Sequence, residues 1–388
     1  MEAATKLESK LGQWLDAGLI DAATAERIRA FEASPGRGSS LQWPVMLAVS
    51  FGGLLITAGV TLFVAAHWAT LSPAARFSIL LFTVAVFHFG GALLADRVPP
   101  LSTTLQGIGT ATLGAAIFLA AQIFNLRENW PTGLLLWSLG AAAGYLLLHD
   151  WVQATLLALL VPAWLVGQWS VTIQSYRGGK RVLAMGLLLT ALTYLSASIG
   201  EQKAPARRAL VWIGCVAVLP CTALEIVMGL QTGFPRYRAY LPSLPTASLA
   251  AGCIVAVLGP LALAWFLRGR AAWINVLWAV WVYGLILAAY YRASFGSKNV
   301  GATLALYLLC AAGSVGLVAW GLREHRKERV NLGIAAFAFT VLFFYFDSFM
   351  DKLGRSESLL LLGVLCLAGG YGLERTRRRL VARMELRI

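Results

Sequence analysis

About twelve long apolar stretches, separated by short polar connectors, fill the sequence from Trp43 to Leu373. A helix rises about 1.5 Å per residue, so roughly twenty apolar residues cross the hydrocarbon layer of a membrane. Only 13% of the residues are charged, whereas soluble domains carry about 25%. The sequence therefore predicts an all-α, polytopic transmembrane bundle with about twelve spans, at 43–67, 74–95, 101–124, 131–148, 152–172, 182–200, 208–230, 246–267, 272–291, 301–322, 330–347 and 357–373.

The break between the fourth and fifth spans, at His149–Asp150, is the shortest, and eleven spans are the alternative. The 42 residues before the first span have a different pattern, with apolar residues at helical spacing in two short segments. Gly18 can end the first segment in a left-handed conformation, and Asp21 can cap the second. We therefore predict a cytoplasmic helical hairpin at 1–34, a linker at 35–42, the multi-span domain at 43–373 and a basic tail at 374–388.

The distribution of Lys and Arg predicts the orientation, because these residues collect in cytoplasmic loops. Basic residues are dense in the connector 323–329 and in the C-terminal tail, and twelve spans place both on the same side as the N-terminus. Both termini are therefore expected in the cytoplasm. The net charge of +14 is explained by loops that face anionic lipid. We expect the lipid bilayer as a partner and no nucleic acid.

Polar residues gather at the outer ends of the first three predicted spans. They predict a binding pocket that opens to the outer side and is formed by His67, Trp68, Arg76, Gln122, Asn125 and Glu128. The alternative is structural: the aromatic residues belong to the interfacial belt, and the amides hydrogen-bond between helices.

Glu225 lies deep in the seventh predicted span, five residues after Pro220. A carboxylate in a membrane costs several kcal/mol unless it is protonated, paired or wet, so Glu225 is a candidate for proton or cation coupling. A structural hydrogen bond is the alternative. Farther along, Asp347, Asp351 and Arg355 repeat every four residues, a spacing typical of ion pairing along one helix.

Several classes of enzyme lack support in this sequence. It has no GxxxxGK[ST] loop for phosphates, no HExxH, no GxSxG and no Cys/His cluster. All five cysteines fall inside apolar stretches, where Cys behaves as a small hydrophobic residue. We therefore expect no cofactor, no metal and no catalytic residue.

Four segments of the first 150 residues resemble a known family. They are WLDAGLIDAATAERIRAFE, GLLITAGVTLFVAAHW, AAIFLAAQIFNL and LLLWSLGAAAGYLLL. They are similar to a bacterial family of predicted inner-membrane proteins, the domain of unknown function 2157. The resemblance implies a cytoplasmic helical hairpin fused to a multi-span domain in the bacterial inner membrane. It implies no reaction, substrate or catalytic residue.

Three functions are compatible with these observations. The leading hypothesis is a transporter or permease-like protein that moves a small solute or ion without ATP hydrolysis. The second is a membrane-embedded scaffold or sensor whose N-terminal hairpin binds a cytoplasmic protein through Trp14, Ile28 and Phe31. The third is a membrane enzyme that acts on a lipid-linked substrate, with His67, Arg76 and Glu128 as acid–base groups.

Overall fold

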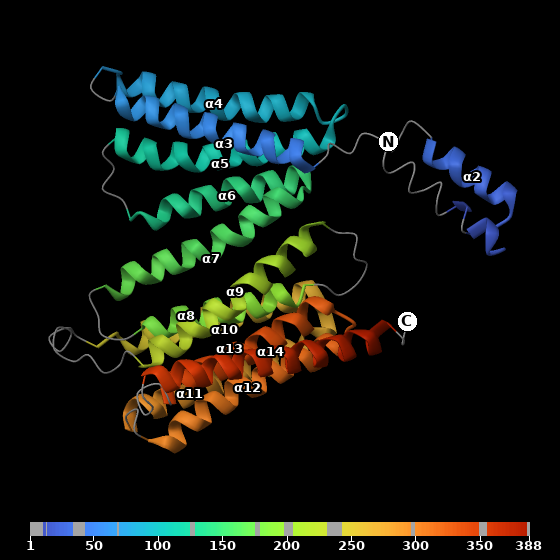
Figure 1. The fold of residues 1–388 in the computed structure, drawn as a ribbon. Coiled ribbons are helices and arrows are strands. Elements are labelled where there is room, and N and C mark those ends of the chain that lie inside the picture. Colours follow the sequence, from blue (N-terminus) through green and yellow to red (C-terminus); the bar gives the residue numbers. More distant parts are fainter. Residues whose placement is uncertain are drawn as a thin grey trace. The chain divides into compact units, whose positions relative to one another are not determined.

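In the computed structural model, the described residues are 11–33 without Gln13, 43–67, 70–124, 129–174, 179–197, 205–230, 243–295, 299–348 and 355–385. The long regular elements within them are helices (Figure 1). In chain order they are α2 (Ala22–Ala33), α3 (Trp43–Ala66), α4 (Pro73–Leu93), α5 (Pro99–Ile123), α6 (Pro131–Leu148), α7 (Trp151–Ile173), α8 (Lys180–Leu195), α9 (Pro205–Leu230), α10 (Thr246–Arg268), α11 (Trp273–Phe295), α12 (Val300–Arg323), α13 (Lys327–Ser348) and α14 (Arg355–Glu385).

Each predicted span coincides with one of the helices α3 to α14. Eight described segments are long and apolar enough to cross a membrane, and the longest of them, Thr246–Ser294, holds both α10 and α11. Gly269, which has a left-handed φ of +56°, separates these two helices. The chain is therefore a multi-pass membrane protein whose described spans are helices, while the count of twelve crossings stays a prediction.

Local sequence signals explain where several helices begin. The helices α4, α5, α6 and α9 start at proline, whose missing N–H is no loss in the first turn. Gly18 has the expected left-handed φ of +66°, and the Asp21 side chain accepts a hydrogen bond of 2.9 Å from the Thr24 N–H at the start of α2. These two local predictions are confirmed. The packing of the N-terminal hairpin and its side of the membrane stay predictions.

The chain divides into two compact units, Met1–Thr112 and Leu113–Ile388, which we call unit 1 and unit 2. In unit 1, α3 packs against α4, and the hydroxyls of Thr57 and Thr112 share a hydrogen bond of 2.9 Å. The Gln106 amide of α5 donates to the His88 carbonyl of α4 at 3.1 Å. These contacts satisfy polar groups of apolar helices through a neighbouring helix, as lipid requires.

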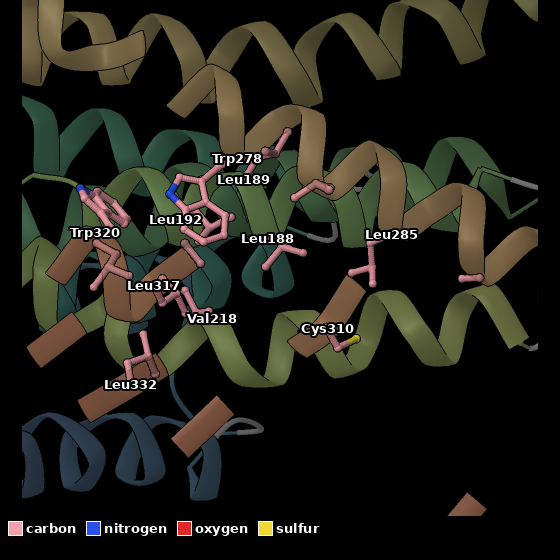
Figure 2. Close-up of a cluster of buried hydrophobic side chains, with 14 of the residues drawn as sticks. Leu188, Leu189, Leu192, Val218, Trp278, Leu285, Cys310, Leu317, Trp320 and Leu332 are labelled. Atoms are coloured by element: carbon pink, nitrogen blue, oxygen red, sulfur yellow. The ribbon is translucent and has the colours of Figure 1, made fainter. Parts of the chain in front are cut away.

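Unit 2 contains the main apolar core. Figure 2 shows Leu188 and Leu192 of α8 beside Trp278 of α11 and near Trp320 of α12. Val218 supplies the contribution of α9 to this buried cluster and is 3% exposed. Around the core, α8 packs against α9 and α10, and α12 packs against α13 (Figure 1).

One face of α9 points into this packing. Gly214, Val218, Cys221 and Glu225 are separated by four, three and four residues, so they lie on one side of the helix. A Cβ atom added at Gly214 would lie 2.4 Å from the backbone N of Leu195 and 2.7 Å from the carbonyl O of Ala191. Only glycine allows α9 to approach the last turn of α8 so closely.

We expect Gly214→Ala to destabilise unit 2, because the new methyl group meets backbone atoms that cannot rotate away. Overpacking of this kind costs about 1–3 kcal/mol. The apparent melting temperature of the purified protein in detergent should fall. The matched variant is Gly369→Ala on α14, where a Cβ has nothing within 4 Å. Equal melting temperatures for the two variants would contradict the tight contact between α8 and α9.

Candidate functional site

Glu225 is the most unusual polar group on α9. Its side chain is 0% exposed, and neither carboxyl oxygen has a hydrogen-bond partner among the described residues. Buried polar groups are nearly always hydrogen-bonded, and each exception calls for an explanation. An unpaired carboxyl group of this kind can bind and release a proton, or hold a cation.

The charge that acts on Glu225 comes from α8. Arg181, in the first turn of that helix, attracts the Glu225 carboxyl group electrostatically. The Arg181 guanidinium lies over the ring of Tyr290 of α11, with its carbon 5.4 Å from the ring centroid. The α8 helix therefore supplies the counter-charge of Glu225, and α11 supplies the aromatic ring on which that counter-charge rests.

The residues of the predicted polar pocket are placed only in part. His67 is exposed, and its Nδ1 lies 3.0 Å from the Phe63 carbonyl of its own helix. Arg76 is 8% exposed, and its Nε–H donates to the Leu71 carbonyl at 3.0 Å. Gln122 is exposed in the last turn of α5. Trp68, Asn125 and Glu128 lie outside the described residues, so the pocket stays a prediction.

A second polar cluster, which we call the Glu324 cluster, ties five helices together at one end of unit 2. Glu324, directly after α12, accepts from Arg268 of α10 at 2.7 Å and from the Trp320 indole at 2.7 Å, and it also pairs with Arg329 of α13. Both arginine side chains are 1% exposed. Two carbonyls at the end of α8 also belong to the cluster: Leu195 accepts from Arg329, and Ser196 accepts from Arg268. Asn275 of α11 completes it by donating to the Ser196 hydroxyl.

The charges in this cluster are matched to their surroundings. The carbonyls that end α8 carry the negative end of the helix dipole, and the Arg329 guanidinium lies 3.9 Å from the Trp320 ring centroid. Burial of Glu324 opposes its ionised form, but hydrogen bonds from two arginines and an indole, with the charge of Arg329, outweigh that effect. They hold the pKa of Glu324 below its ordinary value of 4.5.

The opposite end of the same helices holds a smaller cluster. Asp347 of α13 accepts from Arg292 of α11 at 2.5 Å and from the Tyr307 hydroxyl of α12 at 3.0 Å. The four-residue spacing predicted a pairing along one helix, whereas the described partners of Asp347 lie on other helices. Asp351 lies outside the described residues.

Sequence patterns did not predict the Glu324 cluster. Arg323, Arg326, Lys327 and Arg329 form a basic run, which is most simply a topology signal. Nothing in its spacing distinguishes Arg329, which is buried, from the other three basic residues, which are exposed or half-buried. The one signal was Glu324 itself, an acid that directly follows an apolar helix and precedes this run.

Comparison with known proteins gives a family for the N-terminal part of the chain. Residues 12–154 match the family described as predicted membrane protein (DUF2157). This confirms the resemblance predicted for about the first 150 residues. The DUF2157 region extends from the N-terminal segment through α6 to the start of α7, so Glu225 and the Glu324 cluster lie beyond it. Neither the curated proteins nor the solved structures gave a match.

We expect Glu324→Gln to destabilise unit 2 strongly. The substitution leaves two buried guanidinium groups without their shared carboxylate, and removing one partner of a buried pair costs about 3–5 kcal/mol. Thermal unfolding in detergent should show a large fall in the melting temperature. Glu374→Gln is the matched control, because Glu374 pairs with Arg377 and Arg378 on an exposed part of α14. A fall of the same size in both variants would contradict a special role for the Glu324 cluster.

The lowered pKa of Glu324 also predicts an acid-sensitive stability. A carboxyl group whose pKa is lower in the folded state stabilises the fold above its unfolded value, near 4.5. That contribution is lost as the pH falls through the lower, folded value. The melting temperature of the wild-type protein should therefore fall more steeply below about pH 4.5 than that of Glu324→Gln. Parallel curves for the two proteins would refute this assignment.

Proposed function

We propose that this protein is a permease-like transporter that moves a small solute or ion across the membrane without ATP hydrolysis. The observation that carries the proposal is the unpaired, fully buried carboxyl group of Glu225. An ionised carboxylate without partners is costly in an apolar surrounding, and acids within membrane helices commonly mark ion pathways and proton relays. A group that gains or loses a charge at such a place can couple ion binding to a change in helix packing.

The helix that carries Glu225 has a built-in point of flexibility. Pro220 lies inside α9, where it has no N–H to donate to the Val216 carbonyl one turn earlier. Pro162 and Pro260 occupy comparable positions inside α7 and α10. Helices interrupted by proline can bend where neighbouring groups satisfy the freed carbonyls. These features support a bundle that changes shape during transport.

We also place both termini in the cytoplasm of a bacterial cell and the chain in its inner membrane. Three contacts support the alternation of spans on which this orientation rests. The connectors after α10 and α12, predicted on the inner side, meet in the Glu324 cluster. Arg292 and Asp347, predicted near the outer side, meet at the other end. The basic tail lies with the first group, because Arg377 donates to Asn331 at the start of α13.

A membrane-embedded scaffold or sensor is the second candidate function. Its supporting observation is apolar surface in the N-terminal segment, where Trp14 is 39% and Leu19 is 71% exposed. A cytoplasmic protein could cover these side chains. In that case the spans serve as an anchor, and the chain moves no solute.

Transport can be tested on the purified protein in proteoliposomes by recording transient currents on a solid-supported membrane. The probes are Na⁺, K⁺, a pH step, and a panel of amino acids, sugars and carboxylic acids. We expect at least one probe to evoke a current in the wild type, a current at least tenfold smaller in Glu225→Gln, and an unchanged current in Glu374→Gln.

Two results would count against the transporter. One is a wild-type protein that gives no current with any of these probes. The other is a current that Glu225→Gln leaves unchanged. Deletion of residues 1–34 should preserve the current, because the proposed path does not use the N-terminal segment.

A further inference from the structure

We infer that Glu225 is a proton-binding site and that it exchanges its proton with the side of the membrane on which α9 ends at Leu230. This inference deepens the proposed function and rests on it for its role in transport, since it names the coupling ion and the side of exchange. The binding of the proton itself stands on the geometry of α9 and its neighbours.

The position of Glu225 along its helix favours one side. Glu225 lies five residues before Leu230 and twenty residues after Pro205. At about 1.5 Å per residue, these separations are about 8 Å and about 30 Å along the helix axis. A proton that leaves Glu225 therefore has a short path to the Leu230 end of α9. Its path to the Pro205 end is nearly as long as the hydrocarbon layer is thick.

The longer path is also closed by packing. Gly214 and Val218 lie on the same face of α9 as Glu225, between it and the Pro205 end. Gly214 brings the backbone of α9 against the last turn of α8, and Val218 is buried in the apolar core with Leu192 (Figure 2). Beyond them, Arg329 of the Glu324 cluster binds the Leu195 carbonyl at 3.1 Å. Dense apolar packing of this kind leaves little room for a chain of water molecules.

The surroundings of Glu225 suit a proton better than a metal cation. Arg181 presents a positive charge to the carboxyl group, which repels a bound cation but stabilises a carboxylate. When the O–H bond of the Glu225 carboxyl group breaks, the proton passes to water at the Leu230 end, and both electrons of the bond stay on the oxygen. The guanidinium of Arg181 then balances the new negative charge.

Other charged and titratable groups belong to the helices that pack against α9, namely α7, α8, α11 and α13. The helix α7 contains no Asp, Glu, Lys, Arg or His. Arg292 of α11 and Asp347 of α13 are bound to each other. The remaining groups toward this end of unit 2 are Cys221 on α9, Lys180 and Arg181 on α8, Tyr290 and Tyr291 on α11, and Tyr345 on α13.

Infrared difference spectroscopy of the protein in proteoliposomes tests the site directly, because a protonated carboxyl group has a carbonyl stretching band that a carboxylate lacks. We expect the wild type to show one such band at neutral pH and to lose it reversibly at alkaline pH. The band should be absent from Glu225→Gln and unchanged in Glu374→Gln. Glu225→Asp keeps a titrating acid, so it should shift the band rather than remove it. This variant tests the assignment even if Glu225→Gln does not fold.

The counter-charge and the side of exchange need separate measurements. In Arg181→Gln the band should persist at a pH at which the wild type has lost it, whereas Arg181→Lys should stay close to the wild type. In vesicles of a single orientation, a pH jump on the side opposite the C-terminal tail should change the band before a jump on the tail side does.

Three results would overturn the inference. The first is a wild-type spectrum without the band, or a band that Glu225→Gln retains. The second is a spectral change on addition of Na⁺ or K⁺ at constant pH, which would assign a metal cation to Glu225. The third is a faster response to a pH jump on the tail side. A confirmed band together with no transport current would refute the proposed function and leave the proton site in place.

Discussion

Lipid offers no hydrogen bonds, and this constraint explains most of the polar contacts in the structure. Threonine and glutamine side chains on the apolar helices of unit 1 bond to carbonyls or hydroxyls of their own or neighbouring helices, as Thr57 and Gln106 do. In unit 2 the charged residues gather at the helix ends. Against this background, the carboxyl group inside α9 stands out, because both of its oxygens are buried without a hydrogen-bond partner.

The two ion clusters of unit 2 lie at opposite ends of α12 and α13, which contribute to both. At one end, Glu324 joins α10, α12 and α13 and, through the arginines it holds, the end of α8. At the other end, the contacts of Asp347 within the described part of the chain join α11, α12 and α13. The Glu324 cluster is thus bound to α8, whereas these contacts of Asp347 stay among α11, α12 and α13. Glu225 lies nearer the second end, where fewer polar contacts oppose a movement of α9.

The sequence predicted the helices well, because their lengths follow from the thickness of the hydrocarbon layer and their ends from prolines, glycines and caps. It also singled out Glu225, since an acid within an apolar stretch is visible without a structure. It could not predict that Arg329 is buried while Arg326 is not, or that Asp347 binds Arg292, because these contacts join segments far apart in the chain. Nor could it predict that Gly214 lies against the backbone of α8.

Both proposals require that the Glu225 carboxyl group lies inside the helix bundle without a polar partner. A high-resolution cryo-electron microscopy structure of the full chain in lipid nanodiscs at neutral pH tests it most directly. We expect a buried Glu225 side chain with no protein donor and no bound ion within hydrogen-bonding distance of either oxygen. A Glu225 carboxylate paired with Arg181, coordinated to a metal ion or exposed to the lipid would contradict it.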